Sequence, residues 1–126
     1  MGWQKGSKPA HFGGNDHSVT SVWSIDFDGN ARSVGAEHPT QKPVEIFAIP
    51  MRKHTRKGEI CYEPFSGSGS QIIAGEVTGR RVFAMELQPV FVDVAIRRWQ
   101  EMTGKNAILE ASGASFNKVK DERIPE

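Results

Sequence analysis

An alternation of helix and strand signals along residues 38–111 most constrains what this chain can fold into. The signals predict helices over residues 43–54, 70–77 and 89–103, and strands over residues 59–65, 81–87 and 106–110. A helix between successive strands favours parallel strands joined by crossover connections. The sequence therefore predicts an α/β fold with a parallel sheet.

The chain divides into three parts. Residues 1–37 are rich in Gly, Ser, Asn, Asp and His, and an alternating apolar pattern predicts one strand over residues 18–27. Residues 38–118 carry the alternating elements, and residues 119–126 form a charged tail that we expect to be frayed. Pro50 is expected to bend or shorten the first helix.

The composition limits the class of protein. A length of 126 residues with 37% hydrophobic residues suits one small domain or a piece of a larger one. A net charge of +1 creates no global field toward nucleic acid or a membrane, so any DNA contact must be local. A single cysteine, Cys61, excludes an internal disulfide and fits a cytoplasmic location. No apolar run approaches the ~20 residues that a membrane span needs, and we expect no membrane partner.

A glycine- and serine-rich stretch, EPFSGSGS over residues 63–70, lies between a predicted strand and a predicted helix. Small residues let a backbone approach a ligand closely, and N–H groups at a helix N-terminus attract anions. Ligands of open α/β sheets bind beyond the carboxyl ends of the strands, where this turn would lie. An ordinary strand–helix turn would use the same residues, so the glycines alone leave both interpretations open. Neither the dinucleotide pattern GxGxxG nor the Gly-Lys-Ser/Thr of a phosphate-binding loop is present.

A carboxylate, Glu86, ends the next predicted strand. It could accept hydrogen bonds from both ribose hydroxyls, as the acid about 20 residues beyond the glycines does in nucleotide-binding folds. A solvated acid at a strand end is the alternative, but the preceding glycine turn favours binding. A further loop, HPTQKP over residues 38–43, is stiffened by two prolines and offers Lys42 to a carboxylate. From its residues alone, a capped helix start on the surface is the better interpretation of this loop.

Together these residues resemble the amino-methyltransferases of DNA, which modify N6 of adenine or N4 of cytosine. The resemblance runs from about Trp23 to Phe116 and rests on HPTQKP, EPFSGSG, a strand ending in Glu86, and then PVFVDVAIRRWQEMTG. The family usually has Asp where this chain has Glu63 and Thr where it has Ser70. The resemblance implies a partial Rossmann-like methyltransferase sheet that binds S-adenosyl-L-methionine.

The resemblance also implies residue roles. The loop over residues 38–43 would close over the methionine part of the cofactor. The turn over residues 63–69 would pass beneath the cofactor with Phe65 packed against it, and Glu86 would bind the ribose. The implied cofactor-binding residues are His38, Thr40, Gln41, Lys42, Glu63, Phe65, Ser66, Gly67, Ser68, Gly69, Ser70 and Glu86.

The catalytic motif of that family does not occur in these 126 residues, which contain no Pro-Pro pair. The motif is Asp, Asn or Ser, then two prolines and an aromatic residue, and it lies upstream in members whose cofactor motifs come last. It accepts hydrogen bonds from the exocyclic NH₂ of a flipped base and aligns the amine for attack. We therefore assign no catalytic residue and expect this chain to transfer no methyl group by itself. Residues 1–37 are interpreted as the remnant of a catalytic and target-recognition region, and the abrupt opening favours a truncated chain.

Other charged and polar residues carry weaker signals. Arg97 and Arg98 are expected to serve a helix surface and a partner carboxylate. His11 and His17 are too sparse to predict a metal site. The basic run over residues 52–57 could contact phosphates, but cations at the negative end of a helix explain it better.

Three functional hypotheses remain open. The chain is the cofactor-binding portion of a DNA methyltransferase, a binding module or remnant that has lost catalysis, or an unrelated nucleotide-binding α/β domain. The resemblance implies DNA as the partner of the complete enzyme. An exposed sheet edge would also favour self-association or pairing with an upstream half.

Overall fold

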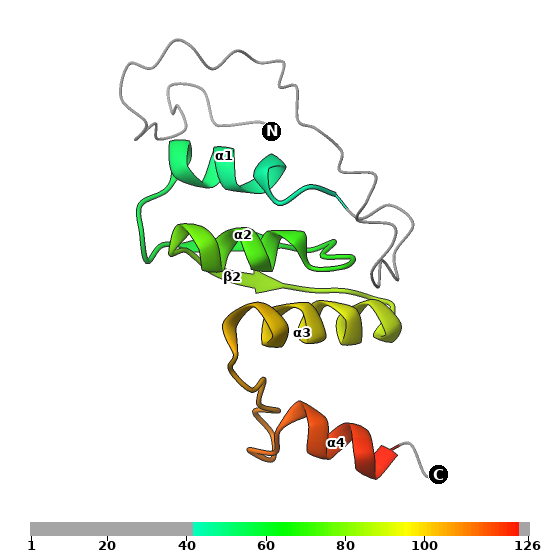
Figure 1. Ribbon diagram of the computed structural model, residues 1–126. Helices are drawn as coiled ribbons and strands as arrows, with labels where there is room; N and C mark the ends of the chain where they lie inside the picture. The colour runs from blue at the N-terminus through cyan, green and yellow to red at the C-terminus, as the bar shows by residue number, and fades with distance from the viewer. Residues whose placement is uncertain (1–41, 124–126) are drawn as a thin grey trace.

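Two short strands lie parallel to one another in the computed structural model, which describes residues 42–123. The elements are α1 (Glu45–His54), β1 (Ile60–Glu63), α2 (Ser70–Thr78), β2 (Arg81–Ala84), α3 (Pro89–Thr103) and α4 (Phe116–Arg123). Helix α2 joins the two strands, and it lies between α1 and α3 (Figure 1). The predicted α/β fold with parallel strands and a crossover helix is confirmed, while the strand predicted over residues 18–27 lies outside the described residues.

The two faces of the small sheet differ in how they are covered. Cys61 and Val82, paired in register on the same face, pack against a core of α1 and α2 side chains. That core consists of Ala48, Met51 and Ala74, with Val44 and Phe47 packed against it. The other face carries Ile60, Tyr62 and Phe83, all exposed. Alternation of side chains along each strand produces this difference.

Local signals fix the helix ends. Gly79 and Gly104 follow α2 and α3 with φ angles of 75° and 70°, so both helices end in the left-handed conformation that glycine favours. Pro89 begins α3, as its fixed φ angle allows at a first helical position. Pro50 does not end α1, which continues to His54.

Two sequence predictions near the C-terminal end are wrong. Residues 106–110 do not form a third strand of the sheet. Instead Ile108 makes an isolated antiparallel bridge to Ser115, because the chain turns at Gly113 and Leu109 N–H bonds to Ala114 O at 2.9 Å. The local turn thus satisfies the backbone groups that a sheet neighbour would have used.

The expectation that the chain frays after Lys118 is also wrong for residues 119–123, which belong to α4. Ser115 Oγ accepts a hydrogen bond from Lys118 N–H at 3.3 Å, as a helix-capping serine does. Phe116 and Val119 face a hollow that they share with Val92 of α3. The capping serine and the apolar residues along this hollow are consistent with a helix in this charged segment.

Across the part of the chain that the structure describes, the helices are too short or too polar to cross a membrane.

Candidate functional site

The turn between β1 and α2 is shaped by the carboxylate of Glu63. One of its oxygens accepts a hydrogen bond from Phe65 N–H at 2.7 Å, and the other accepts from Gln71 Nε2 at 2.6 Å. Glu63 therefore braces both ends of the turn. The Glu63 side chain thus contacts both the backbone of the turn and the first turn of α2.

Gly69 allows the turn to pass very close to α3. Its φ angle is +83°, and a Cβ atom added to it would lie 2.6 Å from Ala95 Cβ. Real Cβ atoms do not approach so closely, and non-glycine residues rarely adopt this φ angle. Both the backbone conformation and the close packing therefore require glycine at residue 69, which precedes α2.

Glu86 lies against the glycine turn, although α2 and β2 separate the two in sequence. Its Oε2 accepts a hydrogen bond from Gly67 N–H at 2.6 Å, and its Oε1 accepts from Gln88 N–H at 3.0 Å. The turn is also joined to the segment after β2 by Ser66 N–H, which donates to Met85 O at 2.9 Å. The structure thus brings the predicted ribose-binding acid and the predicted turn together at the carboxyl ends of two parallel strands.

Lys42 is the described residue of the HPTQKP loop that reaches this site. Its backbone carbonyl accepts a hydrogen bond from Ser70 Oγ at 2.8 Å, which ties the loop before α1 to the N-terminus of α2. The other predicted loop residues, His38, Thr40 and Gln41, lie outside the described residues.

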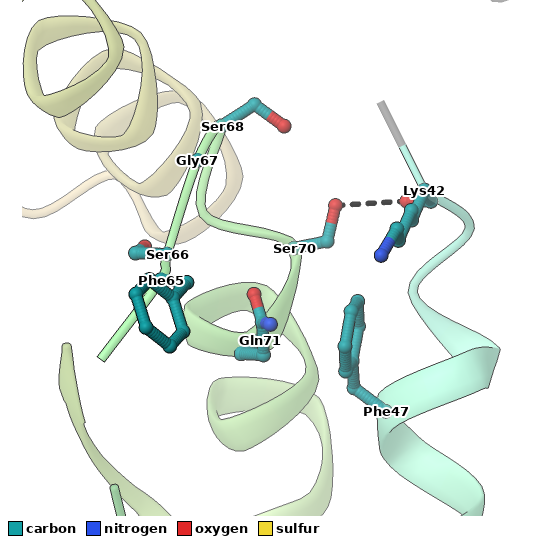
Figure 2. A pocket seen from close by; sticks show the side chains of 8 residues that line it. All are labelled: Lys42, Phe47, Phe65, Ser66, Gly67, Ser68, Ser70 and Gln71. Atoms are coloured by element: carbon teal, nitrogen blue, oxygen red, sulfur yellow. Dashed lines mark hydrogen bonds between the residues drawn. The ribbon is translucent and has the colours of Figure 1, made fainter. Parts of the chain in front are cut away.

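A pocket of about 190 Å³ opens beside the turn. Figure 2 shows Lys42 and Phe47 on one side of it and Phe65 and Ser66 on the other. Its remaining lining residues are Gly67, Ser68, Ser70 and Gln71. The volume is below the ~300–1,000 Å³ of complete ligand sites, so this pocket can hold one end of a cofactor-sized molecule.

Ser66 has a buried hydroxyl without a partner in this pocket. Only 7% of the residue is exposed, and its Oγ makes no hydrogen bond to any group in residues 42–123. Buried polar groups are almost always satisfied, by protein, water or ligand. The Ser66 hydroxyl is therefore left without a hydrogen-bond partner by residues 42–123.

Two exposed apolar side chains flank the acid and the turn. Leu87, directly after Glu86, is 90% exposed, and Phe65 is 84% exposed. Phe65 is one of the predicted site residues. Leu87 was not predicted, although its position directly after the carboxylate was the available signal. An apolar surface next to the predicted ribose-binding acid would suit the flat face of a nucleobase.

The prediction that Arg98 meets a partner carboxylate is wrong. Its guanidinium Nη1 instead donates to Ser68 O at 2.7 Å and to Ser68 Oγ at 3.1 Å. Burial lowers the pKa of Arg98, because desolvation disfavours the charged form. The helical spacing of Arg98 from Val94 and Ala95, both buried, places it on the inner face of α3. This spacing was the sequence signal that Arg98 lies inside the fold.

No cluster of three or more His, Cys, Asp or Glu side chains that could hold a metal ion occurs within residues 42–123.

A glycine turn, an acid and a pocket at the carboxyl ends of parallel strands define a cofactor-binding α/β domain. The family model described as DNA methylase, for N6 and N4 methyltransferases, matches residues 3–97. The chain therefore belongs to the DNA methylase family.

Curated relatives include type II methyltransferases. The chain is 31% identical over 88 residues to the type II methyltransferase M2.MboI of Moraxella bovis, covering 70% of this chain and 32% of that protein. It is 30% identical over 98 residues to M.XycI of Xanthomonas campestris pv. cyanopsidis, covering 78% of this chain and 31% of that protein. The chain thus spans about a third of the length of these relatives.

Solved structures give similar matches. A complex of M1.HpyAVI with S-adenosylmethionine (SAM) matches with a TM-score of 0.47 and 29% identity, over 49% of this chain and 32% of that one. The putative DNA modification methylase TTHA0409 of Thermus thermophilus, complexed with S-adenosyl-L-methionine, matches with a TM-score of 0.46 and 28% identity, over 59% of this chain and 27% of that one.

Proposed function

We propose that this chain binds S-adenosyl-L-methionine as the cofactor-binding portion of a site-specific DNA methyltransferase, one that methylates N6 of adenine or N4 of cytosine. The observation that carries the proposal is the 2.6 Å contact between Glu86 and Gly67, which assembles acid and turn beside the pocket. Membership of the DNA methylase family supports the same conclusion.

The residues present fit the two ends of this cofactor. Glu86 would accept hydrogen bonds from the ribose hydroxyls, and the exposed Leu87 and Phe65 would contact the adenine. The pocket would take the amino-acid end, with the Lys42 ammonium near the carboxylate. Gly69 keeps the turn close to α3.

The bound cofactor would supply the methyl group on its sulfonium. This chain's residues would bind and orient that molecule, and positioning of this kind lowers the entropic part of the barrier. The acceptors for the exocyclic amine are not among the 126 residues, which contain no Pro-Pro pair. DNA is accordingly proposed as the partner of the complete enzyme.

Calorimetric titration tests the proposal against its alternatives. We expect S-adenosylmethionine or its demethylated product, S-adenosylhomocysteine, to bind at least ~10-fold more tightly than ATP or NAD, a difference of about 1.4 kcal/mol. Equal binding of all four ligands would instead support an unrelated nucleotide-binding domain. If none of the four ligands binds, we would conclude that the chain is a remnant that keeps the shape of the site without its binding activity.

A second, independent proposal concerns association. The face of the sheet formed by Ile60, Tyr62 and Phe83 is exposed, with Tyr62 64% exposed. Exposed apolar side chains gathered on one face, here beside the cation Arg81, are typical of an interaction site. We propose self-association, or pairing with a segment equivalent to the upstream part of the relatives.

A further inference from the structure

Arg98 begins a continuous chain of hydrogen bonds through the candidate site. Besides its contacts to Ser68, its Nη1 lies 3.4 Å from Ser70 Oγ, and that hydroxyl donates to Lys42 O at 2.8 Å. A hydroxyl carries one proton and two lone pairs, so Ser70 can accept from Arg98 while it donates to Lys42. The chain of contacts therefore links α3, the glycine turn and the residue that precedes α1.

The placement of Arg98 is costly for folding. The side chain is half-buried, and the lowered pKa of its guanidinium reflects the penalty of removing a cation from water. Its acceptors are a carbonyl and two hydroxyls, so no opposite charge among them offsets that penalty.

The acceptors of Arg98 are also residues of the pocket. Ser68 and Ser70 line it together with Lys42, so any movement of these serines changes the shape of the pocket. Binding is tightest when a site is already ordered in its bound conformation, since less freedom is then lost. A side chain that holds the turn in its binding conformation therefore increases the affinity of the pocket for its ligand.

We propose that Arg98 is a positioning residue for the cofactor site: it fixes the turn over residues 66–70 in its binding conformation and couples that turn to Lys42. This inference rests on the proposed function, because it assigns the reason for the contact to ligand binding. It adds a residue on α3, outside the glycine turn, the HPTQKP loop and the acid.

The test compares Arg98→Met, which keeps an apolar stem, and Arg98→Lys, which keeps a charge but not the planar fork. Arg123→Met, at the exposed end of α4, serves as the matched control. Each protein is titrated calorimetrically with S-adenosylhomocysteine. Amide hydrogen exchange of residues 66–70 is then measured without ligand and compared with exchange in the core of α1.

We expect Arg98→Met to bind at least ~10-fold more weakly, and its turn amides to exchange at least ~10-fold faster, with the α1 amides unchanged. The affinity and the turn exchange rate of Arg98→Lys should fall between those of Arg98→Met and those of the unaltered protein. Both quantities in Arg123→Met should equal those of the unaltered protein. Ser70→Ala provides a second variant that cuts the link to Lys42 and leaves the charge in place. It should weaken binding by less than Arg98→Met does.

Unchanged binding and unchanged turn exchange in Arg98→Met would overturn the proposal. So would a uniform rise in exchange over α1 and the turn, with unchanged affinity of the folded fraction, because that result describes a purely structural residue. If the unaltered chain binds no ligand, the proposed function fails, while the exchange rates of the turn still report whether Arg98 orders it.

Discussion

Glu86 Oε2 lies 2.6 Å from the backbone nitrogen of Gly67, so the acid that follows β2 accepts a hydrogen bond from the turn that follows β1. The contact orients the carboxylate before any ligand arrives. A carboxylate oxygen can accept more than one hydrogen bond, so the same group can hold the turn and receive ribose hydroxyls. Glu86 therefore holds the turn in place, and under the proposed function the same carboxylate would also receive the ribose hydroxyls.

Replacing Glu86 with Ala should lower the affinity for S-adenosylmethionine at least ~10-fold. The substitution removes two charge-assisted hydrogen bonds to the ligand, each worth ~1.5–3 kcal/mol, and leaves Gly67 N–H without its carboxylate. Glu86→Gln should lose less, because one oxygen acceptor remains. Calorimetric titration measures both variants.

Glu110→Ala is the matched control for these substitutions, because Glu110 is exposed and lies after α3. Its affinity should equal that of the unaltered chain. Unchanged affinity in Glu86→Ala would remove the ribose assignment.

Replacing Gly69 with Ala should destabilise the fold more than replacing Gly58 with Ala. The two glycines have φ angles of +83° and +85°, so each alanine carries the same conformational cost of ~1–2 kcal/mol. Only Gly69 is crowded by Ala95, which adds ~1–3 kcal/mol for overpacking. Urea denaturation gives both free energies of unfolding. Equal losses in the two variants would show that α3 does not press on the turn.

Local patterns made much of this fold predictable from the sequence. Gly79 and Gly104 ended their helices as expected, since a glycine stop depends only on neighbouring residues. Parallel pairing of β1 and β2 followed from the helix between them. The proximity of Glu86 to the turn followed as well, because the carboxyl ends of adjacent parallel strands share one edge.

Features that depend on which of several groups a residue bonds to were not predicted from the sequence. The apolar run around Ile108 looked like a strand, but its hydrogen bonds went to the segment around Ser115 after the turn at Gly113. Arg98 looked like a surface cation, because the serine acceptors that hold it come from a different element. The turn at Gly113 decides the first case. In the second, the spacing of Arg98 from Val94 and Ala95 indicates the inner face of α3, but it does not identify the serine groups that accept its hydrogen bonds.

The exposed sheet face predicts association in solution. Tyr62 and Phe83 lie side by side in the register of β1 and β2 and are 64% and 50% exposed, and the guanidinium of Arg81 lies 5.5 Å from the centre of the Phe83 ring. We expect a homodimer or larger assembly at micromolar concentration, and we expect the double variant Tyr62→Lys, Phe83→Lys to dissociate it by placing charge on the apolar face. Multi-angle light scattering measures the mass.

Val77→Lys is the control for the association experiment, since Val77 is also 64% exposed but lies on α2. It should leave the assembly intact. A monomer in the unaltered chain, or equal dissociation by the control, would argue against this face as the interface.

The last prediction is that these 126 residues alone transfer no methyl group to DNA. An exocyclic amine is a poor nucleophile, because its lone pair is delocalised into the base. Transfer therefore needs acceptors that hold the NH₂ in line with the methyl group, in a site closed to water. The early acids Asp16, Asp26 and Asp28 are not followed by the two prolines and aromatic residue that supply this geometry in the family.

The assay uses tritiated S-adenosylmethionine with mixed genomic DNA, and a complete N6 or N4 DNA methyltransferase as the positive control. We expect no label above background with the chain alone. Label should appear when a separate polypeptide carrying the Pro-Pro motif of a relative is added, because that piece brings the base-flipping and amine-aligning groups. The Glu86→Ala variant should then reduce the label, since the cofactor must come from this chain's site. Label incorporated by the chain alone would show that its own side chains align the amine, and the assignment of these residues to cofactor binding only would have to be abandoned.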